Sequence, residues 1–148
     1  MKPARAAGYS GKALDAKLGL KAGWAALLIG APGALIPAVS RPDFNWSAAI
    51  ATGAALPAAM PKLDHVHLFT DRGAGLARYL ARLRARLKPA GQIWVSWPKR
   101  ASGVATDLTE DVVRGAALEA GLVDVKVCAV DMVWSGLKLV IPLDQRAR

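Results

Sequence analysis

The chain of 148 residues has little that would link it covalently or hold it in a membrane. Its one cysteine, Cys128, excludes an internal disulfide and is typical of a reducing compartment, so we expect the cytoplasm. The charge-free stretches 22–40 and 44–61 are interrupted by prolines and rich in alanine and glycine, which insert weakly. Residues 1–21 are polar and do not resemble a signal peptide. The sequence therefore predicts no membrane insertion.

Acidic residues are also scarce. There are 11 of them against 20 lysines and arginines, which gives a formal net charge of +9. Such an excess attracts polyanions, whether nucleic acid, an acidic lipid surface or a phosphorylated ligand. The alternative is a composition rich in arginine and alanine that serves no charged partner. The length is typical of one domain, so we expect residues 1–148 to form a single domain with flexible tails at 1–9 and 145–148.

The pattern of apolar segments predicts strands of two kinds. Runs that are apolar on both faces are typical of strands inside a parallel sheet, and alternating runs are typical of half-exposed antiparallel strands. Buried strands are expected at 24–29 and 92–97, further strands at 65–70 and 45–52, and an alternating pair at 123–129 and 137–143. The stretch 34–62 carries too weak a pattern to define boundaries.

Helical patterns flank these strands. Helices are expected from Ser10 to Leu18 with Gly19 as the end, after Asp71 along the stripe Leu76, Leu80, Leu83 and Leu87, and from Asp107 to Gly121. The stripe has the three- and four-residue spacing of an amphipathic helix, while Asp107 and Glu110 resemble a capping box. The order of elements indicates an α/β fold with a parallel centre and an antiparallel edge.

The segments that connect these elements resemble those of class I methyltransferases. The matching segments are Leu20–Gly23 ahead of the first strand, Leu87–Gly91 ahead of a later one, and Ala120–Leu122 ahead of the last two. The resemblance implies a Rossmann-like sheet with a C-terminal antiparallel hairpin at its edge, reduced in size.

The chain is also similar to a family of small bacterial proteins of unknown function. This similarity rests on Gly8–Gly11, Lys17–Lys21, Ile93–Val95 with Trp97–Lys99, and Trp134–Lys138. It implies the same fold and no particular activity.

The methyltransferase resemblance implies S-adenosylmethionine as a possible cofactor, with Gly30, Pro32 and Gly33 as its loop. In that family an acidic residue precedes a Gly-x-Gly-x-Gly turn, and a second carboxylate after the next strand binds the ribose. Here Leu28 or Ile29 takes the first position, and only Asp43 is a candidate for the second. A buried polar group without a partner costs about 1–3 kcal/mol. The sequence therefore favours a domain without this cofactor, and its length is short for a complete enzyme.

Polar residues gather after the predicted strand 92–97, where open α/β sheets bind ligands. They are Lys99, Arg100, Ser102, Gly103, Thr106 and Asp107. The N-terminus of the helix expected next adds partial positive charge. The pattern predicts a site for a small anion such as phosphate; the alternative is an exposed loop with solvated cations. The same crevice is expected to include His67, Trp97, Trp134 and Ser135.

Two further patterns have both functional and structural interpretations. His65 and His67 lie two apart in a strand and so share a face, as metal ligands can, but no third ligand is evident and no metal site is predicted. Arg78, Arg82 and Arg86 recur every four residues without an acidic partner, which suggests a stripe for nucleic acid or another polyanion. The alternatives are histidines packed under a helix and a solvated helix face.

Three functions stay open. The favoured one is a degenerate methyltransferase-like domain that binds a small anionic ligand or a protein partner, without established catalysis. The others are a divergent S-adenosylmethionine-dependent methyltransferase and a basic nucleic-acid-binding accessory protein.

Overall fold

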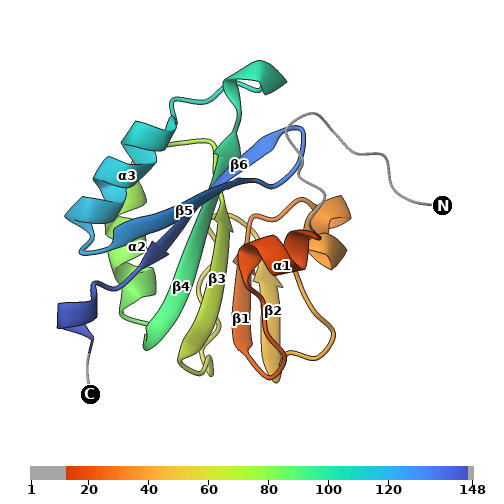
Figure 1. Cartoon of the computed structure of the whole chain (residues 1–148), viewed down its shortest axis with the longest axis vertical. Helices are drawn as coiled ribbons and strands as arrows, with labels where there is room; N and C mark the ends of the chain where they lie inside the picture. The colour runs from red at the N-terminus through yellow and green to blue at the C-terminus, as the bar shows by residue number, and fades with distance from the viewer. Residues whose placement is uncertain (1–12, 147–148) are drawn as a thin grey trace.

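The computed structural model describes residues 13–146 (Figure 1). Ser10 and the Gly8–Gly11 segment lie outside the described residues. The strands are β1 (Ala25–Ile29), β2 (Trp46–Ile50), β3 (Leu63–Phe69), β4 (Leu87–Pro98), β5 (Val123–Ala129) and β6 (Trp134–Val140). The helices are α1 (Leu14–Leu18), α2 (Leu76–Arg84) and α3 (Glu110–Glu119), with 3₁₀ turns at Gly33–Ala38, Arg100–Ser102 and Leu143–Gln145. No helix within this range has the length and apolar character needed to cross a bilayer.

All six strands form one sheet in the order β2-β1-β3-β4-β6-β5. The first four are parallel to one another, β6 is antiparallel to β4, and β5 is antiparallel to β6. The structure thus confirms the α/β fold with a parallel centre and a C-terminal antiparallel hairpin. Within the hairpin β5 takes the edge, because β6 lies between it and β4.

Helices cover the two faces of the sheet unequally (Figure 1). On one face α2 and α3 pack on aliphatic side chains of the strands, among them Leu27, Val66 and Ile93. On the other face lie α1 and the 3₁₀ turn Gly33–Ala38, over Leu28, Phe69 and Trp94 among others. Because both faces are covered, all five residues of β1 are buried, as the unbroken apolar run predicts.

The expectation that Arg86 and Leu87 belong to the second helix is wrong. The helix ends at Arg84, and Leu87 is the first residue of β4, opposite Leu63 of β3. Pro89 lacks the N–H that a helix interior requires, so the chain turns into the sheet before reaching it. Leu87 is buried all the same, since the new strand carries it into the core beneath α2.

The expected helix starts are wrong as well. At α3 the capping residue is Thr109, whose hydroxyl accepts a hydrogen bond from the Val112 N–H at 3.2 Å. At α2 the residue before the helix is Gly75, at φ 74°, which has no side chain to cap with. Asp71 and Asp107 lie upstream in the loops. The first expected helix is confirmed at its end, where Gly19 is left-handed at φ 71°.

Candidate functional site

Three loops leave the same edge of the sheet, at the carboxyl ends of β1, β3 and β4. Because β1 lies between β2 and β3, the order of the parallel strands reverses there, and ligands of open α/β sheets bind beside such a point. Two hollows flank this edge, one after β4 and one between the ends of β1, β2 and β3.

The larger hollow, the β4 cleft, has a volume of 580 Å³. It brings together five of the six residues predicted for the anion site, with Ser102 left out of the lining. Its lining is Trp97, Lys99, Arg100, residues 103–110 and Ser135. Ser135 reaches it because β6 pairs with β4, which sets Ser135 directly opposite Trp97. Trp97 and Ser135 therefore lie in the crevice expected for them.

Several polar side chains of this loop form hydrogen bonds that fix the conformation of the loop. The Ser102 hydroxyl donates to the Lys99 carbonyl at 2.6 Å and accepts from the Val104 N–H at 3.1 Å. The Thr106 hydroxyl donates to the Asp71 carbonyl at 2.6 Å, and the Asp107 carboxylate accepts from the Gly73 N–H at 2.8 Å. The segment after β4 is thereby fastened to the segment after β3.

Two cations at the cleft are not engaged in this way. Neither the Lys99 ammonium nor the Arg100 guanidinium forms a hydrogen bond or ion pair within residues 13–146, although the Lys99 backbone N–H donates to the Val133 carbonyl at 2.7 Å. Lys99 is half-buried and Arg100 is exposed. Their charges are therefore available to an anion.

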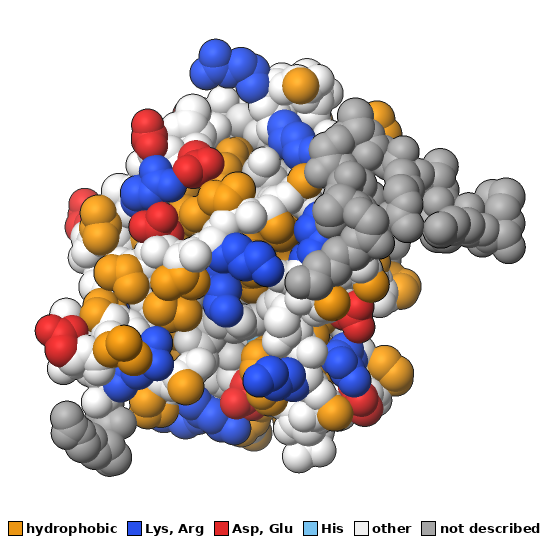
Figure 2. Space-filling view, in the orientation of Figure 1, with side chains coloured by type: hydrophobic (Ala, Val, Ile, Leu, Met, Phe, Trp, Pro, Cys, Tyr) orange, Lys and Arg blue, Asp and Glu red, His pale blue; other side chains and the backbone are white. Residues whose placement is uncertain are grey.

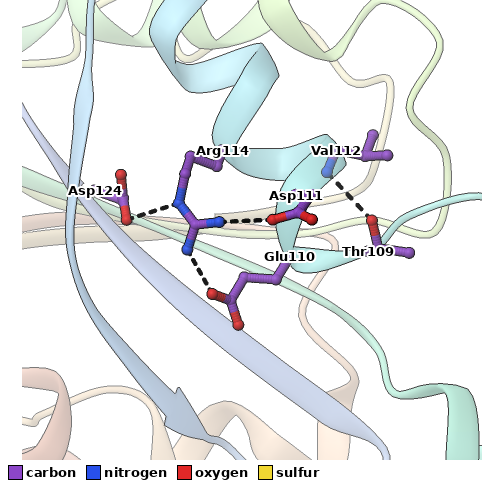
Figure 3. Close-up of polar contacts among 6 residues, drawn as sticks. All are labelled: Thr109, Glu110, Asp111, Val112, Arg114 and Asp124. Carbon is purple, nitrogen blue, oxygen red and sulfur yellow. Dashed lines mark hydrogen bonds and ion pairs between the residues drawn. The ribbon is translucent and has the colours of Figure 1, made fainter.

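The acidic side chains at the start of α3 share one cation, Arg114 (Figure 3). Its guanidinium pairs with Glu110, with Asp111 at 2.9 Å and with Asp124 of β5 at 3.0 Å. These hydrogen bonds and charges raise the pKa of Arg114. Glu110 is directed toward Arg114 and Asp107 toward the Gly73 N–H, so neither carboxylate that lines the cleft pairs with Lys99 or Arg100.

His67 and Trp134 do not line the β4 cleft; they belong to the face of the sheet beneath α1. His67 stacks on Phe69 with the ring centres 4.2 Å apart, and Phe69 meets Trp134 edge-on at 5.2 Å. His67 Nε2 lies 2.7 Å from the Ser96 hydroxyl, and His65 Nδ1 lies 2.9 Å from Gln92 Nε2.

Both histidines are completely buried. Burial lowers the pKa of His65 to about 3 and that of His67 well below its usual value, so both are neutral at pH 7. His65 and His67 do share one face, as their spacing predicts. Residues 13–146 nevertheless bring no three His, Cys, Asp or Glu side chains together as a metal site.

The loop after β1 does not offer the groups that S-adenosylmethionine needs. Gly30 has φ 71°, and a Cβ there would collide with the Thr52 hydroxyl and the Phe69 carbonyl, so the three loops touch at this point. β1 and β2 end in Ile29 and Ile50, without a carboxylate. Asp43 precedes β2, at the opposite edge of the sheet, and pairs with Arg41 at 2.8 Å. It is therefore misplaced as a ribose ligand.

The smaller hollow, the switch-point cavity, has a volume of 260 Å³ and was not anticipated from the sequence. It is lined by Ile29, Leu68, Leu76, Thr52, Thr70, Arg72 and Tyr79, together with residues 53, 74 and 75. Gly30, Pro32 and Gly33, the predicted cofactor loop, are not part of the lining. That loop leads to the opposite face of the sheet, where the turn Gly33–Ala38 packs near α1.

The positive charge is distributed differently from the predicted arginine stripe. Arg82 lies over the Tyr79 ring at 5.7 Å, whereas Arg86 follows the helix, 3.5 Å from the Met60 carbonyl. Arg78 is exposed on α2. The stripe therefore keeps only Arg78 and Arg82 on one helix.

Positively charged side chains also lie on the side of the sheet that carries α1, over the hairpin β5–β6 (Figure 2). Lys126 of β5 is directly opposite Lys138 of β6. Burial, and then Lys126 and Lys21, lowers the pKa of Lys138. Like charges facing each other across strands are destabilising. The register of the hairpin, which the sequence pattern did not define, is what reveals this pair.

Known structures share this arrangement of the chain. A methyltransferase from Aquifex aeolicus, described as S-adenosylmethionine-dependent, superposes with a TM-score of 0.67 over 86% of this chain and 87% of its own, at 16% identity. The fold is methyltransferase-like. A precorrin-6y C5,15-methyltransferase from Geobacter metallireducens (0.59; 86% and 84%; 15% identity) shares the same methyltransferase-like fold. Neither protein-family models nor curated proteins match the sequence.

Proposed function

We propose that this protein is a methyltransferase-like domain that binds a small anionic ligand, of the size of a phosphate group and its carrier, in the β4 cleft without transferring a methyl group. The same proposal groups it with the small bacterial proteins that its sequence resembles. The observation that carries it is the pair Lys99 and Arg100, two adjacent cations without partners in the described chain at the ligand-binding edge of the sheet.

The surroundings of these cations favour an anion. Thr109 and Glu110 line the cleft, so the first turn of α3 faces it. The Val112 N–H donates to the Thr109 hydroxyl and the Val113 N–H to the Thr109 carbonyl, whereas the N–H groups of Glu110 and Asp111 have no hydrogen bond within residues 13–146. Such groups, with the helix dipole, bind phosphate and carboxylate. The internal bonds of Ser102, Thr106 and Asp107 keep the loop in place, which lowers the entropic cost of binding.

The test is calorimetry with inorganic phosphate, pyrophosphate and adenosine monophosphate as probes, on the unmodified chain and on Lys99→Ala/Arg100→Ala. We expect one of the probes to bind, with an affinity at least tenfold lower in the double variant and an unchanged melting temperature without ligand. Arg78→Ala/Arg82→Ala removes the same charge from α2 and serves as the matched control. Equal affinity in both double variants would refute the proposal.

A divergent methyltransferase is the second candidate. It is supported by the structural neighbours, among them a magnesium protoporphyrin IX methyltransferase from Synechocystis solved with bound S-adenosylhomocysteine (TM-score 0.55, 12% identity). The missing carboxylates at the ends of β1 and β2 speak against it. Calorimetry with S-adenosylhomocysteine decides between the two, since the first proposal expects no heat at millimolar concentrations and a methyltransferase expects saturable binding.

Nucleic-acid binding is the third candidate, supported by the opposed lysines Lys126 and Lys138. Binding to phosphates through lysine releases counterions, so the affinity for RNA would fall steeply with salt. Titration of a labelled single-stranded RNA with the unmodified chain and with Lys126→Gln/Lys138→Gln is the test. A salt-independent affinity, or one that is equal for both proteins, removes this candidate.

A further inference from the structure

We propose that two copies of this chain associate through the outer edge of β2, with the two strands paired antiparallel across a twofold axis. The sheet of one copy then continues into the sheet of the other. This interface goes beyond the proposed function, because no residue of β2 lines the β4 cleft. The proposal rests on the free edge of β2, on its contrast with the opposite edge of the sheet and on the charge around it.

β2 is an edge strand that has a partner on one side only. It pairs with β1, and no other strand of residues 13–146 follows it in the sheet (Figure 1). The segment 51–62, which leads from β2 to β3, contains no helix. The five residues of β2 are therefore half-buried or exposed, whereas those of β1 are all buried. An unpaired row of backbone N–H and C=O groups is a template for another strand.

The opposite edge, β5, carries protective features that β2 lacks. β5 includes Asp124 and Lys126, and its register with β6 shifts between these two residues. Charged side chains and bulges on an edge strand prevent it from pairing with another chain. β2 has neither charge nor proline in Trp46–Ile50, and its pairing with β1 is regular over all five residues. Of the two edges, β2 is therefore the one suited to a further strand.

The distribution of charge favours a second copy as the partner. Each chain carries a formal net charge of +9, so two copies repel each other wherever their cations face. The stretch 44–61, which comprises β2 and most of the connection to β3, contains no charged residue. Two copies that meet there bring no like charges of β2 together, whereas an acidic partner finds no cation on this strand. Contact between identical patches about a twofold axis is also the commonest form of assembly among soluble proteins.

The side chains of β2 complement one another in this arrangement. With the twofold axis at Ala48, Ser47 of one copy lies opposite Ala49 of the other. Trp46 of one copy then lies opposite Ile50 of the other. Both of these larger residues pack at the margin of the aliphatic core, where they are only partly buried. An aromatic side chain opposite a β-branched one stabilises antiparallel strands, so the pairing extends the aliphatic core from one copy into the next.

The experiment is to measure the mass of the full chain by light scattering from micromolar to millimolar concentrations, together with hydrogen exchange. We expect a mass twice that of the 15.5 kDa chain at the upper end of this range. Exchange of the outward-facing amides of β2 should slow as the dimer forms, while exchange in β5 should not change. A monomer at every concentration, or a dimer in which exchange of β2 is unaltered, overturns the proposal.

Variants assign the interface. Ser47→Lys/Ala49→Lys introduces like charges opposite one another and should weaken dimerisation by about tenfold or more. Val125→Lys/Val127→Lys adds the same charge at positions of β5 that are 55% and 49% exposed, so it is the matched control and should leave the dimer intact. Equal losses in both variants would assign the effect to net charge, and a loss in the control alone would assign the interface to β5. Either result overturns the proposal.

A charge swap tests the pairing itself. Ser47→Glu/Ala49→Glu should also be monomeric alone, but an equimolar mixture with Ser47→Lys/Ala49→Lys should form a mixed dimer, because each introduced lysine then lies opposite an introduced glutamate. A mixture that stays monomeric, with both variants folded by circular dichroism, contradicts antiparallel pairing of β2. Lys99→Ala/Arg100→Ala should dimerise as the unmodified chain does, so this proposal and the anion site fail separately.

Discussion

The two faces of the sheet differ in the kind of side chain that they bury. The face beneath α2 and α3 is mainly aliphatic. It presents Leu, Val and Ile side chains from β1, β3, β4 and β6. The face beneath α1 presents His65, His67, Gln92 and Ser96, the four buried polar side chains of the described chain, in two neighbouring strands. One face is held mainly by the area it removes from water. The other also buries polar side chains whose hydrogen bonds are only partly made, since His65 Nε2 and His67 Nδ1 have no partner among the described residues.

The reason for the difference lies in what covers each face. α2 and α3 are nine and ten residues long and bring a full apolar stripe, whereas α1 has only five residues. The short helix is held at its end, where Gln92 Nε2 and Trp94 Nε1 both donate to the Leu18 carbonyl, at 2.9 and 3.1 Å. A helix of this length is not stable alone, so contacts from the sheet must fix it.

The largest effect is expected from truncation on the aliphatic face. Leu80 of α2 is fully buried, so Leu80→Ala should lower the free energy of unfolding by about 2–5 kcal/mol through lost burial and the cavity left behind. The measurement is urea unfolding at pH 7.5. Leu118→Ala on α3, where the leucine is 58% exposed, is the control and should change stability by less than about 0.5 kcal/mol. If the two variants behaved alike, the contrast between buried and exposed leucine would be wrong.

Acid should act on the other face. The folded protein keeps His65 and His67 neutral because burial lowers their pKa, to about 3 for His65, while the unfolded chain takes up protons near pH 6.5. Stability is therefore complete above pH 6.5 and is lost as the pH falls from 6.5 toward 3. Each histidine contributes up to about tenfold in the unfolding equilibrium per pH unit, or about a hundredfold for both at pH 5.5.

Urea unfolding between pH 8 and pH 5 measures this effect. The range ends above the titration of ordinary carboxylates, so the histidines dominate it. His67→Gln keeps a polar side chain beside Ser96 and should remove about half of the slope. A stability that is flat from pH 7 to pH 5 in the unmodified chain would contradict the neutral, buried state of both imidazoles.

The sequence predicts an element of this fold when its apolar pattern fits only one kind of secondary structure. The run 24–29 is apolar on both faces and too short for a helix, which favours a central strand, and β1 lies between β2 and β3. Leu87 fits both the helical stripe and the start of a strand, and pairing with Leu63 decides for the strand. In β5 the register shifts between Asp124 and Lys126, which leaves Val125 and Val127 half-exposed and buries Cys128.

The candidate sites follow the same rule. Lys99 to Asp107 is a continuous segment after a strand, and its place at the ligand-binding edge can be predicted from the order of elements alone. The switch-point cavity is assembled from Thr52, Arg72 and Tyr79, which come from three separate segments. Thr52 lies in the stretch 34–62, whose composition of alanine, glycine and proline gives no periodicity. That Thr52 lies beside the cavity can be recognised only once the pairing of the strands is known.

The smallest effect of a single substitution is expected at the hydrogen bonds that hold α1 on the polar face. Gln92→Leu removes one of two donors to the Leu18 carbonyl and the partner of His65 Nδ1, and should cost about 1–3 kcal/mol. Trp94→Phe removes the other donor to that carbonyl. Each single variant leaves one donor in place, whereas the double variant leaves the carbonyl unpaired. The double variant should therefore lose more stability than the sum of the single losses, and hydrogen exchange should show α1 opening before α2. Additive losses would mean that the two donors act independently and that apolar burial of Leu18, rather than its carbonyl, fixes α1 on the sheet.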